Sequence, residues 1–543
     1  MPEQVITLKS LPGIKRDGTR LEGDNYVDGQ WVRFQRGLPR KIGGYRMVNQ
    51  YLSDIPRTLH EYTRDQLTYI HAGSATGVER FYFDGAYTTS AVSDRTPTTL
   101  TASEANLWQF DVETAPGLGG AQLLAQVAPN LNCICNSLGG QLFYGDLFGT
   151  GPLTELTVAG GNLPVGVSLT GGVVSLHPYT FIFGNDGYVA WSTAGDPTDF
   201  VSTGSGSANI TGQKIVRGMP LRGGAGNSPS GLFWSADSLL RASFVGGEAI
   251  FQFDTISAET SIMSAQSVIE YDGIFYWVGS DRFLSFNGVV REIENGLNQN
   301  FFFDSLNYEQ RQKVFAVKVP RFGEIWWCFP KDDAIEPNHA VIYNVRENTW
   351  YDLALPEGGR SAGIFPAVFR RPLMAGVEPA FNDIDTRITE AGDTRITESG
   401  ATRITEESGN ARYKFWVHEV GTDKIDGLNI QPIPSYFETA DISLPVQAGQ
   451  NSALQVLLVE PDFVQTGDMT LEVHGRANAR SPEVNSDPVT FPETATTPQE
   501  QVVFLKTQRR ELRFRFESNT LGGDYQMGTI LVHVRPGDGT VLG

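Results

Sequence analysis

The feature that most constrains the fold is an aromatic strand core that recurs along the chain. Each copy is a short run of apolar and aromatic residues, a composition that favours β-strands. The copies are Leu67–Ile70, Gln141–Tyr144, Phe181–Phe183, Leu232–Trp234, Ile274–Trp277 and Ile325–Cys328. Where consecutive copies are visible they lie roughly forty to fifty residues apart, which is the spacing of β-propeller blades. The wider gap between Tyr69 and Phe143 predicts a further unit near Leu107–Phe110.

Two of these units share a longer pattern. Residues 231–246 and 273–288 both run from an aromatic strand through a turn with a small residue and Asp to a second strand that ends in Gly. A single blade cannot bury its own faces, so repeated hairpins of this kind are expected to stack around an axis. We therefore predict an all-β fold with a propeller of about six or seven blades over residues 51–380. A β-sandwich or a β-helix remains an alternative, because sequence patterns identify strands better than their topology.

The last part of the chain predicts a separate β domain. In Glu511–Glu517 the apolar residues Leu512, Phe514 and Phe516 alternate with charged ones, so one face of this strand should be buried and the other wet. We predict a β-sandwich or platform domain over residues 413–543. Before it, residues 381–412 carry three copies of a Thr-Arg-Ile-Thr-Glu unit, which are either an exposed insertion or a small β arm that touches a neighbouring subunit.

Charge is distributed unevenly along the 543 residues. The formal net charge is −20, but the first fifty residues hold nine Lys and Arg against five acidic residues, so this segment is +4 and the remainder −24. An acidic body argues against tight wrapping of nucleic acid and is compatible with a passage along which DNA slides without sticking. We interpret residues 1–50 as a basic docking segment with the first strands. Its candidate docking charges are Arg33, Arg36, Arg40 and Lys41, which could instead only solvate strand edges.

The sequence offers no residues for catalysis, so we predict that the protein is not an enzyme. Cys133, Cys135 and Cys328 cannot form a disulfide framework or a zinc site, and the seven histidines lack metal-binding spacing. No glycine-rich segment has the order of residues that cradles a phosphate. We predict no cofactor and no metal. No segment approaches the ~20 apolar residues of a membrane span, and the N-terminus lacks the apolar run of a secretion signal.

Three groups of motifs resemble the tail nozzle proteins of short-tailed phages, the family called tail tubular protein B or packaged-DNA stabilisation protein. The first is Asn25–Tyr45, which contains Trp31-Val-Arg-Phe34 and Gly37-Leu-Pro-Arg-Lys-Ile-Gly-Gly44. The second is Trp191–Phe200 followed by Leu232–Ser235 and Ile274–Phe283, and the third is Arg509–Asn519 with Tyr525–Gly528 and Pro536–Gly539. Together they span nearly the whole chain. The chain departs from the family pattern at Arg510-Glu511, at Tyr525-Gln526 and in the Thr-Arg-Ile-Thr-Glu repeat, so contact details are not carried over at these positions.

The resemblance implies a viral structural protein of the virion tail, made in the cytoplasm of the host bacterium. It implies a homo-oligomeric ring, hexameric in the family, that extends the DNA channel below the adaptor and portal proteins, retains the packaged genome and allows its ejection. The implied partners are the adaptor and portal, tail fibres or spikes, and double-stranded DNA that passes without tight binding. The alternative function is a propeller lectin or a glycan-degrading receptor-binding tail spike.

Overall fold

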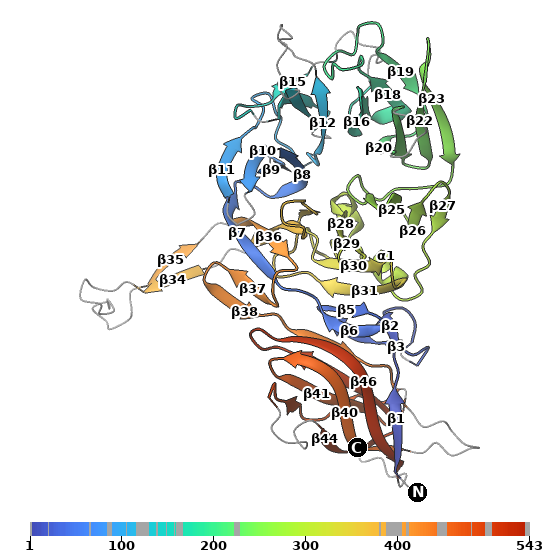
Figure 1. The fold of residues 1–543 in the computed structure, drawn as a ribbon, viewed down its shortest axis with the longest axis vertical. Helices are drawn as coiled ribbons and strands as arrows, with labels where there is room; N and C mark the ends of the chain where they lie inside the picture. The colour runs from blue at the N-terminus through green and yellow to red at the C-terminus, as the bar shows by residue number, and fades with distance from the viewer. Residues whose placement is uncertain are drawn as a thin grey trace.

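The computed structural model describes residues 3–19, 21–64, 67–83, 89–104, 106–115, 130–136, 140–147, 149–156, 158, 167–221, 228–378, 382–386, 404–408, 412–442, 453–478, 480–494 and 502–537. The described chain is built almost entirely of β-strands and is elongated (Figure 1). A ring of sheets forms one end, and a two-sheet domain beside the labelled N and C ends forms the other.

Six four-stranded antiparallel sheets follow one another along the chain, each with its strands in sequence order. We number them blades 1 to 6. Blade 1 has β8 (Pro56–Arg64), β9 (Leu67–Ser74), β10 (Val78–Phe83) and β11 (Thr89–Asp94), and blade 2 has β12 (Gln109–Ala115), β13 (Asn130–Asn136), β14 (Leu142–Asp146) and β15 (Thr154–Glu155). Blade 3 has β16 (Gly172–Leu176), β17 (Tyr179–Phe183), β18 (Tyr188–Trp191) and β19 (Gly206–Asn209), and blade 4 has β20 (Ile215–Pro220), β21 (Ser230–Ser235), β22 (Leu239–Gly246) and β23 (Ile250–Ser257). Blade 5 has β24 (Ile269–Tyr271), β25 (Ile274–Val278), β26 (Phe283–Phe286) and β27 (Val290–Glu292), and blade 6 has β28 (Phe315–Val319), β29 (Glu324–Phe329), β30 (His339–Asn344) and β31 (Thr349–Ala354).

A seventh blade closes the ring with strands from both ends of the sequence. Its order is β32 (Ala362–Ile364), β33 (Leu373–Glu378), β36 (Arg412–His418) and β7 (Tyr45–Leu52), so its fourth strand comes from the N-terminal part. The strands β37 (Asp423–Asp426) and β38 (Asn429–Pro432) extend the same sheet beyond β7. The inner strand β32 contacts β28 of blade 6 on one side and β8 of blade 1 on the other. The described residues therefore form a seven-bladed β-propeller, which confirms the predicted fold class.

The aromatic cores that revealed the repeat lie mostly in the second strand of a blade. Every residue of β21 and of β29 is buried, because both faces of a blade pack against neighbouring blades. Such strands read as continuous apolar runs rather than as an alternating pattern. Between blades 4 and 5, Trp234 and Trp277 meet edge to face with ring centroids 5.8 Å apart. Tight turns help the strands reverse, as at Asp272 and Gly273, where both φ angles are positive.

The additional unit predicted between Tyr69 and Phe143 does not exist as a blade of its own. Trp108 and Phe110 belong to the start of blade 2, and Phe143 lies in the third strand of that same blade. The spacing is wide for two reasons: the Phe143 core is one strand later in its blade than the other cores, and fourteen residues separate β12 from β13.

The second domain is a β-sandwich to which the N-terminal segment contributes strands. One sheet has the order β44 (Val503–Arg509), β40 (Leu454–Thr466), β46 (Asp524–Pro536), β6 (Leu38–Lys41) and β5 (Val32–Gln35), with β1 (Gln4–Leu8) also paired to β46. The other has β4 (Asp28–Gln30), β39 (Ser435–Glu438), β45 (Glu511–Ser518), β41 (Met469–Arg476) and β42 (Val484–Asn485), with β43 (Val489–Phe491) on β41. The remaining elements are β2 (Leu11–Ile14), β3 (Asn25–Tyr26), β34 (Asn382–Thr386), β35 (Ile404–Ser408), the helix α1 (Gln299–Ser305) and the 3-10 turns η1 (Asn185–Gly187) and η2 (Tyr308–Lys313).

The structure moves two of the expected domain boundaries. Residues 1–50 are not a separate segment, since β1, β4, β5 and β6 belong to the sandwich and β7 begins inside this range. The boundary expected at residue 412 falls in β36, which is a propeller strand. Of the Thr-Arg-Ile-Thr-Glu repeat, only the antiparallel pair β34 and β35 is described, and residues 387–403 lie outside the described residues. The pair interrupts the closing blade between β33 and β36.

The alternation predicted for β45 holds for its apolar residues. Leu512, Phe514 and Phe516 are buried in the sandwich core. Arg513, expected on the wet face, is buried as well, and its Nε lies 2.9 Å from Glu438 Oε2. No helix among the described residues is long and apolar enough to cross a membrane.

Candidate functional site

The axis of the propeller is filled by polar side chains that bond across it. Gln266, just before blade 5, donates from Nε2 to Thr58 Oγ1 in blade 1 and to the Trp108 carbonyl beside blade 2, both at 3.1 Å. Gln109 of blade 2 donates to the Val216 carbonyl of blade 4 at 2.9 Å. In a seven-bladed ring these blades are not neighbours, so the bonds span the axis. The axis is therefore occupied by side chains and is not an open passage.

Several ionisable groups are buried in blades 1 and 2. Burial, with the charge of Arg217, lowers the pKa of His60 to about 4, and burial lowers the pKa of His71 well below its ordinary value. Both ring nitrogens of His71 lack a hydrogen-bond partner among the described residues, and its ring stacks on Tyr62 and Phe110. Burial raises the pKa of Asp111 to about 6. These groups are neutral packing elements near pH 7, apart from Asp111.

Stability should consequently fall on mild acidification. Below about pH 6.5 the unfolded chain protonates His60, His71 and the equally buried His418, whereas the folded protein does not, so protons favour unfolding. Asp111 opposes this, because the folded protein takes up its proton first. The net loss from about pH 6.5 to about pH 5 should be about 3 kcal/mol. Denaturant titrations across this range measure it. His71→Leu should remove about 1.5 kcal/mol of the pH dependence. An unaltered slope in this variant contradicts the assignment.

A polar depression of about 720 Å³ lies beside the first strands of the blades, with Arg57 of β8 and Val216 of β20 in its lining. Arg57 is paired there with Glu336 at 2.6 Å and with Glu104 at 3.2 Å, and Lys313 also contacts Glu336 at 2.9 Å. The charges of Arg57 and Lys313 are thus matched within the chain. Among the described residues no group of three or more His, Cys, Asp or Glu is placed to hold a metal ion.

The junction between the propeller and the sandwich contains buried ion pairs that join the two domains. Arg33, at the middle of β5, is 1% exposed, and its guanidinium lies between Glu324 of blade 6 and Glu419 after β36. Nη2 donates to Glu324 Oε2 at 3.0 Å, and Nη1 donates to Glu419 Oε2 at 2.9 Å. Tyr351 Oη donates to the other Glu324 oxygen at 2.6 Å. Burial alone would lower the pKa of Arg33, but the two carboxylates raise it above the ordinary value, so the pair is ionised.

A second arginine fastens the N-terminal segment to the same blade. Arg16 donates from Nε and Nη2 to the two carboxylate oxygens of Asp352 in β31, at 2.8 and 3.0 Å. This bidentate arrangement is a strong form of arginine–carboxylate pairing. Asp17 next to it accepts from the backbone amides of Asn300 and Phe301 at the start of α1. The N-terminal segment thus binds the propeller of its own chain.

The four predicted docking charges have different environments. Arg33 and Lys41 are 1% and 3% exposed, and Lys41 Nζ donates to the Gly523 carbonyl at 2.8 Å, so neither can present its charge to another protein. The docking prediction is wrong for these two, because their partners lie within the chain. Arg36 is exposed in the two-residue β5–β6 turn, and Arg40 is partly exposed and donates to Gln35 Oε1. For Arg36 and Arg40 docking stays a prediction.

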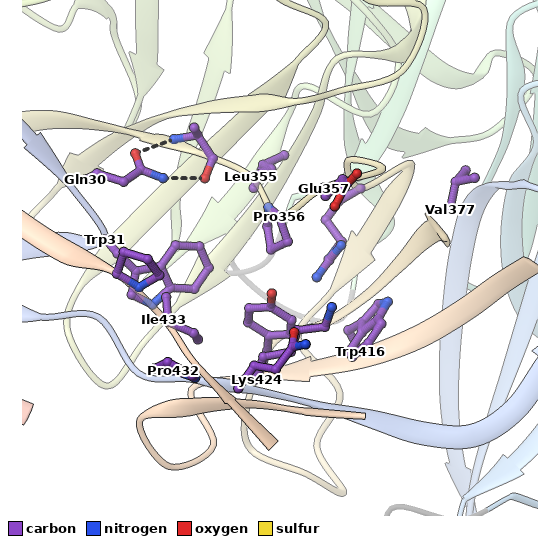
Figure 2. A pocket seen from close by; sticks show the side chains of 15 residues that line it. Gln30, Trp31, Leu355, Pro356, Glu357, Val377, Trp416, Lys424, Pro432 and Ile433 are labelled. Carbon is purple, nitrogen blue, oxygen red and sulfur yellow. Dashed lines mark hydrogen bonds between the residues drawn. The ribbon is translucent and has the colours of Figure 1, made fainter. Parts of the chain in front are cut away.

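An aromatic pocket of about 560 Å³ opens at the same junction (Figure 2). Trp31 and Ile433 line one side, Trp416 and Lys424 the lower side, and Pro356 lies above them in this view. Gln30 bonds both backbone groups of Ala354 along the rim, at 2.9 and 3.0 Å. These two bonds connect β4 of the sandwich to the end of blade 6.

Arg360 also lines this pocket and has no carboxylate partner among the described residues. Its guanidinium lies over the rings of Tyr45 and Trp416, at 5.2 and 5.3 Å from their centroids, and Nε donates to His418 at 3.1 Å. Burial lowers the pKa of Arg360 to about 10. Cation–π contacts therefore replace an ion pair at this position. No local sequence pattern pointed to Arg360, because the aromatic rings that it contacts come from two distant strands, β7 and β36.

No protein-family model and no curated protein matches the chain. Among solved structures the chain is similar to the WD40 repeats of RRP9 in a crystal structure, with 7% sequence identity over 70% of this chain and 99% of that chain and a TM-score of 0.34. This likeness is too distant to carry an argument, and the propeller assignment rests on the order of strands in the sheets.

Proposed function

We propose that this chain is a structural subunit of a phage tail nozzle. Copies form a ring that extends the DNA channel below the adaptor and portal, retains the packaged genome and lets it pass on ejection. The proposal starts from the three groups of motifs in the sequence. It is supported most by one observation: the propeller and the sandwich are fastened together by shared N-terminal strands and by the buried pairs of Arg16 and Arg33.

This construction suits a part that must withstand force. A flexible linker would let two domains move independently, whereas here the N-terminal segment enters the sandwich, contacts blade 6 and then forms the fourth strand of blade 7. Several fastenings must open together before the domains separate. A subunit of this kind transmits force between neighbours without changing shape.

The closed propeller axis also bears on where DNA would pass. Side chains span the axis, so a channel through a single subunit is ruled out for the described residues. In a ring, the passage would lie between subunits and would be lined by their surfaces. Because the chain carries a net charge of −20, such a lining repels phosphate and favours sliding over binding.

Imaging of assembled particles tests the proposal. Particles of the phage that encodes this chain should show a ring of its copies at the tail, located by an antibody fragment or a fused label. Particles that lack the chain should package DNA and then lose it. A label found only on peripheral fibres, or intact genome retention without the chain, contradicts the nozzle function.

The alternative, a glycan-binding or glycan-degrading spike, has one observation in its favour, the aromatic pocket of Figure 2. Aromatic rings commonly provide the apolar faces of ligand sites. However, Trp31 and Trp416 are only 2% and 5% exposed, so they offer little ring surface to a sugar. Binding of host surface polysaccharide that is lost in Trp416→Ala would support this alternative.

A further inference from the structure

A group of arginines lies uncompensated on the surface beside the buried Arg33 pair. We call Arg40, Arg321, Arg370 and Arg371 the arginine patch. Together with the buried Arg33 and Lys41 they line two adjoining depressions of about 140 and 300 Å³, in which Glu419 and Asp524 are the acidic residues. Glu419 is already paired with Arg33. The patch is therefore strongly positive on a chain whose net charge is −20.

The guanidinium groups of the arginine patch have no carboxylate partner among the described residues. Arg321 and Arg370 are exposed, and their guanidinium groups make no hydrogen bond or ion pair with the described residues. Arg371 donates to the Glu419 backbone carbonyl rather than to a carboxylate. Since arginine pairs best with carboxylate or phosphate, the patch is suited to an anionic partner.

The floor of the two depressions is aromatic. Phe322 lies beneath three guanidinium groups, with those of Arg33, Arg321 and Arg40 at 3.7, 5.3 and 5.8 Å from its centroid. Phe365 and Phe369 line the larger depression. Depressions of these sizes match single side chains, so the surface suits acidic and apolar side chains of a protein better than the broad backbone of a DNA duplex.

The same chain carries the complementary surface on another side. Residues 231–310, which run from the second strand of blade 4 through blade 5 and α1 to the start of η2, contain eleven acidic residues against three basic ones. Ten of the eleven are exposed, Glu248, Asp254 and Glu259 among them. Val245 and Val289, 52% and 59% exposed, lie on hairpin tips in this region. The strands β23 and β27 form an outer edge of the propeller, away from the junction with the sandwich (Figure 1). We call Glu248, Asp254, Glu259 and Glu292, which are exposed in or beside these two strands, the acidic edge.

We propose that the arginine patch of one copy binds the acidic edge of blades 4 and 5 of the next copy. The contact joins two different surfaces, so it is heterologous, and a heterologous contact closes into a ring when the rotation between copies allows it. This inference rests on the proposed ring function and supplies its interface. Electrostatic attraction of this kind weakens as salt screens the charges.

Charge reversal tests the contact in the full-length protein. The double change Arg321→Glu and Arg370→Glu should weaken self-association by about a hundredfold in sedimentation velocity at low salt. Neither guanidinium makes a hydrogen bond or ion pair with the described residues, so the fold should be retained, which thermal unfolding checks. Reversal of Arg480 and Arg535, exposed in the sandwich domain outside both surfaces, is the matched control and should leave association unchanged.

A charge swap makes the pairing specific. Glu248→Lys with Asp254→Lys should also abolish association, because each edge then faces a positive patch. Mixing this variant with the Arg321→Glu, Arg370→Glu variant should restore association, since every patch then meets an edge of opposite charge. Failure of the mixture to associate overturns the pairing.

Three further results would overturn the inference: a wild-type protein that stays monomeric at low salt and high concentration, a reversed patch that associates like wild type, or a patch that binds duplex DNA instead of a second copy. These outcomes are separable from failure of the proposed function. If particles show the ring and the reversed patch still assembles, the interface is wrong and the nozzle function stands. If particles show no ring of this chain, the function fails whatever the association measured in solution.

Discussion

Replacing Arg33 with methionine is expected to lower the free energy of unfolding by about 3–5 kcal/mol. Removing the guanidinium leaves the Glu324 carboxylate fully buried and without its cation, although Tyr351 and Trp326 still donate to it. An unpaired buried charge costs far more than the net value of the pair. Chemical denaturation of the purified chain measures the loss.

The partner of this pair provides the control. Adding Glu324→Gln to Arg33→Met removes the stranded charge, so the double variant should regain part of the stability lost in the single one. Arg36→Met, in the exposed turn three residues away, should change stability by less than about 0.5 kcal/mol. Equal losses of unfolding free energy in Arg33→Met and Arg36→Met would falsify the stabilising role of the buried Arg33 ion pair.

The Arg33 pair illustrates what the sequence could not provide. Arg33 stands in a strongly basic segment, and its surroundings predict a surface charge at least as well as a buried one. Its partners Glu324 and Glu419 are 291 and 386 positions away, and no local pattern connects them. Burial of a charge depends on such distant partners, and for this reason two of the four predicted docking residues proved to be internal.

The strand cores were predictable for the opposite reason. A blade is a local unit of consecutive hairpins, so its apolar runs and its turns lie close together in sequence. Blades 1 to 6 are of this kind. Blade 7 is not, because β7 is separated from β36 by the whole propeller. The sequence therefore predicted the existence of blades but neither their closure nor the shared use of the N-terminal strands.

A second large loss of stability is expected in blade 7, where β7 closes the propeller. Phe415 in β36 is fully buried and meets Phe81 and Phe83 edge to face, with centroids 4.9 and 5.7 Å apart. Phe415→Ala should lower the free energy of unfolding by about 3–5 kcal/mol through loss of apolar contact and creation of a cavity. Because blade 7 holds the ring shut, hydrogen exchange should accelerate in β7, β33 and β36 together.

Phe233 of blade 4 offers a close match for this comparison. It is equally buried in β21 and contacts Phe181 and Phe183, with centroids 5.6 and 5.5 Å apart. Phe233→Ala should cost a similar free energy, but its faster exchange should stay within blades 3 and 4, since the strands of each are joined by short connections. Protection of β7 should fall only in Phe415→Ala. If exchange in β7 accelerates equally in both variants, the propeller opens as one unit and the closing blade is not its least stable part. If it accelerates in neither, β7 is held mainly by its other neighbour, β37, and by the sandwich.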